Sequence, residues 1–268
     1  MSASANYETI NFWNSLQTQK RIVGALVMRE ILTRFGRHNI GFMWLFVEPM
    51  LFTVGVLALW TSLGNHSMKL PIVAFSVSGY SAIIVLRNTI SRCGNAIEPN
   101  KALMHHRNVR VIDFFISRIG LEVVGVSISF LVLSSLLILL GWMQPPADLL
   151  KVLGAWFMLC WLTLGVSFLF GSLFTLSETA DRIWHVASYL FFPLAGPMYM
   201  VHWLPQALQP YALMLPTVHC TELLREGLFG NLVTAHYDLM YLFQCNLAFT
   251  LVGLMSVRYV ANTATAHD

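Results

Sequence analysis

Residues 87–118 read RNTISRCGNAIEPNKALMHHRNVRVIDFFISR and separate two long apolar runs. This stretch holds two acidic residues, Glu98 and Asp113, against six basic ones. The basic residues are Arg87, Arg92, Lys101, Arg107, Arg110 and Arg118. Because Lys and Arg are costly to move across a bilayer, we expect the stretch to stay on the cytoplasmic side of a membrane that both apolar runs cross. Pro99 favours the first turn of a short helix from about residue 99 to 106.

The composition also indicates an integral membrane protein. Of the 268 residues, 56% are hydrophobic and 11% are charged, whereas soluble domains carry about 25% charged residues. The net charge of +3 does not indicate nucleic-acid binding, because the basic residues lie beside the apolar runs. The polar stretch 1–19 lacks the charged start and apolar core of a cleavable signal peptide.

Six segments are apolar over about the 20 residues that a bilayer crossing requires. They lie near residues 42–63, 70–90, 114–141, 150–173, 184–202 and 238–260. With this threading, thirteen Lys and Arg residues fall inside, and only Lys69, Lys151 and Arg225 fall outside. The asymmetry predicts cytoplasmic termini. We therefore expect an all-α protein with a cytoplasmic N-terminus (1–41), a six-helix transmembrane domain (42–260) and a cytoplasmic tail (261–268).

Two segments depart from plain spans. Residues 20–37 (KRIVGALVMREILTRFGR) have helical spacing that puts apolar and charged side chains on opposite faces, which predicts an amphipathic helix in the headgroup plane. The apolar face holds Gly24, Met28, Ile31, Leu32 and Phe35, and the opposite face holds Arg29, Glu30, Thr33, Arg34 and Arg37.

The region after residue 190 contains helix breakers, namely Pro193, Gly196, Pro197, Pro205, Pro210 and Pro216. We expect one or two re-entrant or interfacial helices on the outer side after the fifth span. A periplasmic loop with short surface helices is the alternative.

No motif for catalysis, nucleotide binding or metal binding is found. The sequence has no Gly-Lys pair, so a P-loop is excluded, and any ATP and Mg would be bound by another polypeptide. The adjacent His105 and His106 do not form a metal-binding spacing. We expect Arg118 to pair with Glu122, and Glu48 with Arg87, in structural roles rather than in ion coupling.

Some polar and aromatic side chains within the spans are candidates for lining a canal. They are Trp44, Phe46, Ser76, Tyr80 and Tyr189. Aromatic faces suit the C–H faces of sugars, although helix packing is the ordinary use of such residues. In the outer region, Glu222, Arg225 and Glu226 are expected to cap or staple the short helices rather than to touch an emerging substrate.

The order of these parts resembles the permease subunit of type-2 ABC exporters, most closely the capsule polysaccharide (KpsM-type) branch. A basic amphipathic helix runs into residues 40–50 (IGFMWLFVEPM), with Gly41, Trp44 and Pro49 at the entry to span one. The loop 95–113 and the segment 216–227, with His219, Glu222 and Arg225, carry the other matches.

The resemblance implies a homodimer bound to two ATP-binding subunits in the bacterial inner membrane. Such a complex moves a lipid-linked acidic polysaccharide through a canal between the permeases, toward a periplasmic adaptor and an outer-membrane channel. The coupling helix to the ATPase would comprise Glu98, Pro99, Asn100, Lys101, Leu103, His105 and His106. The lipid phosphate or acidic sugars would meet Arg29, Arg34, Arg37 and Arg87.

Two alternatives remain at this point. The same architecture also exports O-antigen, teichoic acid, lipid or drug. A membrane-embedded transferase would require paired acids or a His-Asp pair at a membrane face, and the sequence offers none that is well placed.

Overall fold

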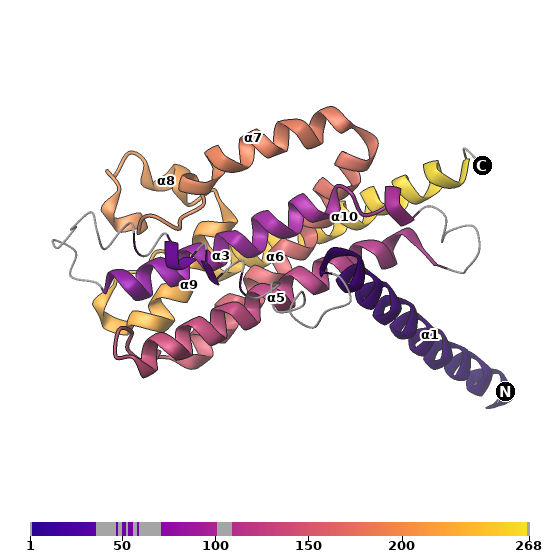
Figure 1. Ribbon diagram of the computed structural model, residues 1–268, viewed down its shortest axis with the longest axis horizontal. Helices are drawn as coiled ribbons and strands as arrows, with labels where there is room; N and C mark the ends of the chain where they lie inside the picture. The colour runs from indigo at the N-terminus through magenta and orange to yellow at the C-terminus, as the bar shows by residue number, and fades with distance from the viewer. Residues whose placement is uncertain are drawn as a thin grey trace.

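The computed structural model describes residues 2–35, 47, 50–51, 53–55, 58, 71–100 and 109–266, without the side chains of 2–12, 34–35, 193 and 264–266. Within these residues the chain is helical and has no strand (Figure 1). The α-helices are α1 (Ser2–Phe35), α3 (Ile72–Cys93), α5 (Val111–Leu139), α6 (Leu149–Leu176), α7 (Glu178–Leu194), α8 (Gln209–Ala212), α9 (Pro216–Phe229) and α10 (Leu239–Ala266). Three 3₁₀ turns join them, namely η1 (Glu98–Asn100), η2 (Val201–Trp203) and η3 (Gly230–Leu232).

In the part of the chain that the structure describes, four helices are long and apolar enough to cross a membrane. They are α3, α5, α6 and residues Leu239–Thr263 of α10. These helices match four of the six predicted spans. The predicted span 42–63 lies mostly outside the described residues, so the total of six spans stays a prediction.

The predicted span 184–202 corresponds to α7, whose bounds differ from the prediction at both ends. The helix begins six residues earlier because the Ser177 hydroxyl accepts a hydrogen bond from the backbone N–H of Ala180 at 3.3 Å. It ends at Leu194 because Gly196 adopts a φ of 94°, a value that glycine tolerates. The 17 residues of α7 extend about 25 Å at 1.5 Å per residue. Charged residues occupy the first turn, so the apolar part is shorter than an ordinary span.

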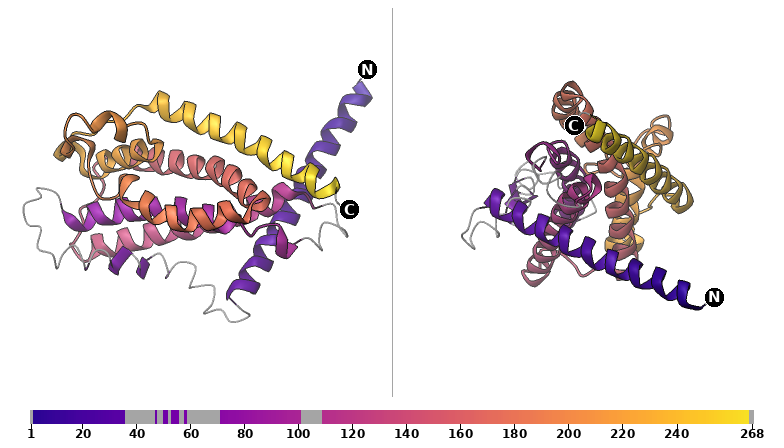
Figure 2. Two further views of the ribbon diagram at one scale, coloured as in Figure 1. Left: turned by 90° about the horizontal axis from the view of Figure 1, so that it is seen from above. Right: turned by 90° about the vertical axis from the view of Figure 1, so that its right-hand side faces the viewer.

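The long helices lie side by side, and α1 crosses them obliquely at one end (Figures 1 and 2). At that end α3 and α6 finish, α5 and α7 begin, and the C-terminal end of α10 lies nearby. We call it the basic end, because Arg87, Arg92 and Arg118 come together there. The other end holds α8, α9 and the turn between α5 and α6 (Figure 2), and we call it the far end.

Residues 20–35 of the predicted amphipathic helix 20–37 are part of α1, which starts at Ser2, and residues 36 and 37 lie outside the described residues. Its apolar residues are divided between two environments. Leu26 is buried against α5, whereas Met28 and Leu32 are about half exposed. The charged residues Arg29 and Glu30 point to the bundle, as described below. The exposed apolar side chains suit contact with lipid, as expected of an interfacial helix.

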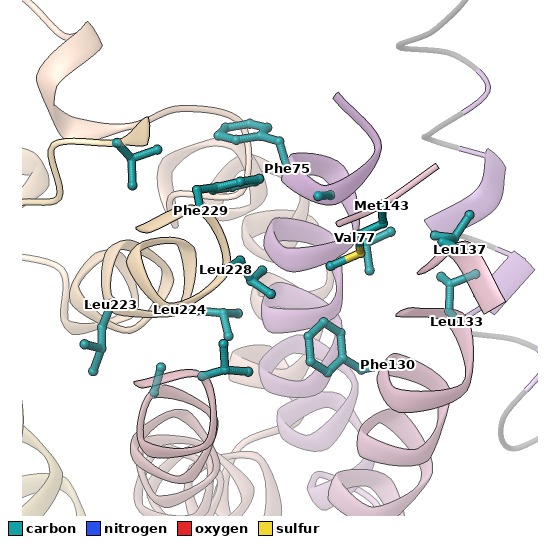
Figure 3. Packing of buried hydrophobic residues seen from close by; sticks show 14 of the residues in the cluster. Phe75, Val77, Phe130, Leu133, Leu137, Met143, Leu223, Leu224, Leu228 and Phe229 are labelled. Atoms are coloured by element: carbon teal, nitrogen blue, oxygen red, sulfur yellow. The ribbon is translucent and has the colours of Figure 1, made fainter. Parts of the chain in front are cut away.

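The apolar core at the far end joins α3, α5, α6 and α9 (Figure 3). Phe130 of α5 stacks on Trp156 of α6 with ring centroids 4.5 Å apart. Leu224 and Leu228 of α9 fill the space beside Phe75 and Val77 of α3. The short helices predicted after α7 are therefore present, and α9 is integrated into the helix bundle rather than lying loosely on its surface.

Close helix approach depends on small residues, as is usual between membrane helices. On α3, a Cβ atom at Gly79 would lie 2.4 Å from the carbonyl oxygen of Pro197 and 2.8 Å from Arg225 Nη2. Only glycine leaves room there for the segment that follows α7.

We expect Gly79→Ala to destabilise the protein by about 1–3 kcal/mol, because the added methyl group forces backbone out of place. The matched control is Gly154→Ala on α6, where nothing lies within 4 Å of an added Cβ. Thermal unfolding in detergent, followed by tryptophan fluorescence, measures both variants. Equal melting temperatures for the two would contradict the packing described for Gly79.

Candidate functional site

A polar cavity of about 620 Å³ lies at the basic end, between α1, α3, η1, α5 and α7. Its lining residues are Arg29, Glu30, Thr33, Arg87, Asn88, Ser91, Arg92, Asn95, Pro99, Asn100, Arg118 and His185. We call it the arginine cavity, because four arginines line it against one carboxylate, Glu30. Outside the lining, Glu122 pairs with Arg92, and Asp181 lies 3.8 Å from His185, so three carboxylates lie in or beside the cavity.

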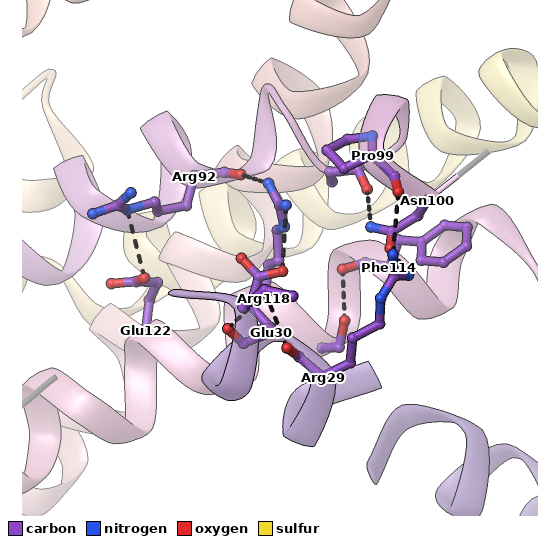
Figure 4. Close-up of polar contacts among 11 residues, drawn as sticks. Arg29, Glu30, Arg92, Pro99, Asn100, Phe114, Arg118 and Glu122 are labelled. Atoms are coloured by element: carbon purple, nitrogen blue, oxygen red, sulfur yellow. Dashed lines mark hydrogen bonds and ion pairs between the residues drawn. The ribbon is translucent and has the colours of Figure 1, made fainter. Parts of the chain in front are cut away.

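Arg118 of α5 joins the three helices that form the cavity wall. Its Nη1 donates to the carbonyl oxygen of Arg92, near the C-terminal end of α3, at 2.8 Å. Its Nη2 lies 3.4 Å from the Glu30 carboxylate of α1. The side chain is 11% exposed, and its Nε is buried with no hydrogen-bond partner in the described part of the chain. Arg118 therefore holds α1 and α3 at fixed positions on α5 (Figure 4).

Arg29 of α1 fastens the same helix to η1. Its Nη1 donates to Asn100 Oδ1, and its Nη2 donates to the carbonyl oxygen of Pro99 at 3.3 Å. Asn100 is buried, and its Nδ2 donates in turn to the carbonyl oxygen of Ala96 at 2.8 Å. Figure 4 shows Arg29 reaching from α1 to the turn that carries Pro99 and Asn100.

Arg87 and Arg92 are the cationic residues that α3 contributes. Arg87 lies over the ring of Tyr189, with its guanidinium carbon 4.3 Å from the ring centroid, a cation–π contact. Within the described residues Arg87 has no carboxylate partner. Arg92 Nε lies 3.8 Å from Glu122, and its side chain is 46% exposed. Both guanidinium groups can therefore reach an anion without breaking a short ion pair.

The predicted charge pairs differ from the observed ones. Arg118 contacts Glu30, and Glu122 contacts Arg92, so each residue of the predicted Arg118–Glu122 pair has a partner on another helix. Glu48, the predicted partner of Arg87, lies outside the described residues. The structural role expected for Arg118 and Glu122 is consistent with these contacts.

The predicted site residues are only partly within the described chain. Arg29 and Arg87 lie in the arginine cavity, as do Pro99 and Asn100, while Glu98 is exposed on η1. The structure does not describe the side chain of Arg34. Predicted site residues that fall wholly outside the described chain are Arg37, Trp44, Phe46, Lys101, Leu103, His105 and His106.

The canal candidates that can be located have different environments. Ser76 and Tyr80 are buried within the single chain, where Tyr80 packs on Phe192 at 5.2 Å between ring centroids. Tyr189 is 67% exposed on α7. Of these three, Tyr189 alone presents a surface to a second molecule, and its partner Arg87 links it to the arginine cavity.

Sequence reasoning did not assign Arg92, Arg118 or His185 to the site. Part of the pattern was visible, because positions 87, 88, 91 and 92 follow helical spacing and form one polar face at the end of α3. Arg118 of α5 and His185 of α7 come next to this face only because the helices pack together, and the sequence does not indicate that packing. Among the described residues, no three His, Cys, Asp or Glu side chains gather as a metal site requires.

At the far end, α9 is stapled to its surroundings by four side chains, of which Arg225 and Glu222 are almost completely buried. Arg225 donates to the carbonyl oxygens of Gly196 at 2.9 Å and Pro197 at 2.7 Å, and lies 3.8 Å over the ring of Phe75. Glu222 accepts hydrogen bonds from the backbone N–H groups of Val201 and His236, at 3.0 and 2.9 Å.

The other staples of α9 are made by His219 and Glu226. His219 contacts the Leu213 carbonyl oxygen at 2.8 Å and accepts from the N–H of Asp238 at 2.9 Å. Glu226 pairs with Lys151 of α6 at 2.9 Å. The stapling role expected of Glu222, Arg225 and Glu226 agrees with these contacts.

We expect Arg118→Gln to lower the free energy of unfolding by about 1–3 kcal/mol, because it removes a charged donor from the Arg92 carbonyl and breaks the ion pair with Glu30. Arg182→Gln is the matched control, since Arg182 pairs with Glu178 while both side chains are at least 80% exposed. Such a surface pair contributes about 0–1 kcal/mol. Chemical denaturation in detergent measures both variants, and equal effects would show that Arg118 does not join the helices.

Comparison with known proteins agrees with the helical membrane architecture. Residues 21–229 match the ABC-2 type transporter membrane family. The chain is 41% identical over 248 residues to the capsule polysaccharide export inner-membrane protein CtrC of Neisseria meningitidis serogroup B, covering 92% of this chain and 94% of CtrC. It is 37% identical, with the same coverage, to the capsule polysaccharide export inner-membrane protein BexB of Haemophilus influenzae.

A more distant relative is the polysialic acid transport protein KpsM of Escherichia coli, which is 27% identical over 253 residues, covering 91% of this chain and 95% of KpsM. The family match spans α3, α5, α6, α7 and α9 together with most of the basic face of α1. This chain therefore belongs to the ABC-2 type transporter family of membrane permeases.

Proposed function

We propose that this chain is the permease of an ATP-driven exporter that moves a lipid-linked, acidic capsular polysaccharide across the bacterial inner membrane. The observation that carries the proposal is its similarity, over more than nine-tenths of its length, to proteins named for capsule polysaccharide export. A separate ATP-binding subunit supplies the energy. On this proposal the basic end and both termini face the cytoplasm, in accordance with the excess of Lys and Arg at that end.

The canal is formed between two copies of the chain. A hydrated polysaccharide cannot cross hydrocarbon, because its hydroxyl groups would lose their hydrogen bonds without replacement. The exposed Tyr189 on α7 is the canal residue best supported by its environment. Ser76 and Tyr80 are buried in the single chain, so they line a canal only if α7 moves away from α3 during transport. A periplasmic adaptor and an outer-membrane channel continue the route.

The coupling helix to the ATP-binding subunit begins at η1 and continues through the segment to His106. Support comes from the position of η1, which follows the end of α3 at the basic end. Pro99 and Asn100 also line the arginine cavity. The ATP-binding subunit and the cargo would therefore meet the permease on neighbouring surfaces.

The arginine cavity receives the anionic part of the cargo, a lipid phosphate or an acidic sugar. Guanidinium groups donate in a forked geometry that matches phosphate and carboxylate oxygens. Four of them surround one cavity, and the two on α3 have either no carboxylate partner among the described residues or only a long contact. Arg34 and Arg37, on the same basic segment of α1 and just after it, would extend this surface toward the headgroups.

Replacement of Arg87 by Gln tests the role of the cavity. A hydrogen bond to a charged group contributes about 1.5–3 kcal/mol, so we expect export to fall roughly tenfold or more. Acidic glycan measured inside cells that carry the variant should rise toward the level in cells that lack the chain. Arg182→Gln, outside the cavity, is the control and should export normally. Normal export by Arg87→Gln would remove Arg87 from the cargo site.

The coupling assignment is tested by Leu103→Asp. A charge in the apolar contact with the ATP-binding subunit should abolish cargo-dependent ATP hydrolysis and export, while membrane insertion stays normal. Leu103→Ile preserves size and apolarity and should retain activity. The measurements are ATP hydrolysis by the purified complex and the amount of chain in the membrane fraction. Full export by Leu103→Asp would exclude Leu103 from the coupling surface.

A further inference from the structure

We infer that Arg29 is a sensor that links occupancy of the arginine cavity to η1, the start of the segment proposed to contact the ATP-binding subunit. The inference rests on the proposed function for the identity of the cargo and the partner. The linking contacts themselves are in the structure. Arg29 extends from α1 along the cavity wall and ends on η1, where it donates to Asn100 and Pro99.

The acceptors that Arg29 uses are both neutral, a side-chain amide oxygen and a backbone carbonyl. In the described residues, Arg29 makes no ion pair. A phosphate group in the cavity is a better acceptor, because its negative charge attracts the guanidinium and its oxygens match the forked donor geometry. Arg87 and Arg92, which also line the cavity, would hold the same phosphate. Phosphate therefore competes with η1 for the guanidinium of Arg29.

The loss of Arg29 from η1 has a defined consequence. Asn100 is 8% exposed, and its Oδ1 would be left buried without its charged donor. A buried polar atom without a partner is unfavourable, so the turn would loosen. Backbone hydrogen bonds in this segment run from Ala96 to the Cys93 carbonyl at 3.1 Å and from Asn100 to the Ile97 carbonyl at 2.8 Å. The bond from Asn100 Nδ2 to the Ala96 carbonyl would remain, so the turn would loosen without being released.

The helix α1, which carries Arg29, stays in place. Arg118 keeps α1 attached to α5 and α3 through Glu30 and the Arg92 carbonyl. Arg29 can therefore leave η1 while α1 keeps its position. By thermodynamic linkage the effect is reciprocal, so an ATP-binding subunit that holds η1 in one conformation alters phosphate affinity by the same factor.

Hydrogen exchange of the purified complex with its ATP-binding subunits tests the inference. The complex is placed in phosphatidylcholine nanodiscs, with or without phosphatidic acid, whose phosphomonoester is the probe, and without nucleotide. We expect phosphatidic acid to speed exchange of the amides in residues 95–100 by about tenfold, the factor that corresponds to one hydrogen bond to a charged group. Arg29→Gln should show fast exchange under both conditions.

The matched control is Arg21→Gln, which removes the same charge from an exposed position on the same helix. It should behave like the wild-type chain. The inference is overturned if phosphatidic acid leaves the exchange of the wild-type turn unchanged, or if Arg29→Gln exchanges as slowly as the wild type. Fast hydrogen exchange of residues 95–100 in the Arg21→Gln variant without phosphatidic acid would also overturn the inference, because the loss of any positive charge on α1 would then explain the effect.

Failure of the proposed function would be seen elsewhere. Cells that lack the chain and still export their acidic glycan would refute the export role, whatever the exchange experiment gives. Conversely, if phosphatidic acid does not change the hydrogen exchange of residues 95–100 in a complex that supports normal export, only the link through Arg29 is refuted.

Discussion

The contacts of the Arg118 guanidinium hold the basic end of the bundle together. One side chain reaches the end of α3 through the Arg92 carbonyl and reaches α1 through Glu30. Without it, α1 would be attached to the bundle through Leu26 and its apolar neighbours and through the contacts of Arg29 with η1 and of Gln19 with Asp113. The arginine cavity exists because α1 is held across the ends of α3 and α5. Partly exposed ion pairs are individually weak, so the attachment suits a helix whose contacts change during a transport cycle.

The far end is held together by buried polar contacts instead of partly exposed ion pairs. Arg225 is completely buried, and it is held by backbone carbonyl groups and the face of Phe75 rather than by a mobile carboxylate. Glu222 likewise accepts from backbone N–H groups. Removal of either residue would leave buried polar groups without partners, which is strongly destabilising. The irregular segment after α7 is therefore held in place by polar groups of the protein itself.

Structural features that depend on long apolar runs and on helix-breaking residues could be predicted from the sequence. Features that depend on how the helices pack could not. The helices α3, α5, α6 and α10 follow from hydropathy, and the broken region follows from its prolines and Gly196. The serines around Tyr80 suggested a lining helix, yet Ser78 donates to the Phe75 carbonyl of its own helix at 2.9 Å, so its hydroxyl needs no water. Arg29 and Asn100 are 71 positions apart, and no periodicity predicts that they meet.

The helices α3 and α7 both extend from the basic end, which is held by partly exposed ion pairs, toward the far end, which is held by buried polar contacts. Arg87 and Tyr189 join them at the arginine cavity, where Trp184 Nε1 also donates to the Ser91 hydroxyl at 3.1 Å. At the far end, the carbonyl of Gly196, just beyond α7, is held by Arg225 beside Gly79 of α3. At the basic end, α7 also packs against α3 and α6 through an apolar cluster that includes Ile90, Phe174 and Trp184. The helix α7 is therefore held at both of its ends, and a movement that exposes Tyr80 would have to break contacts at both.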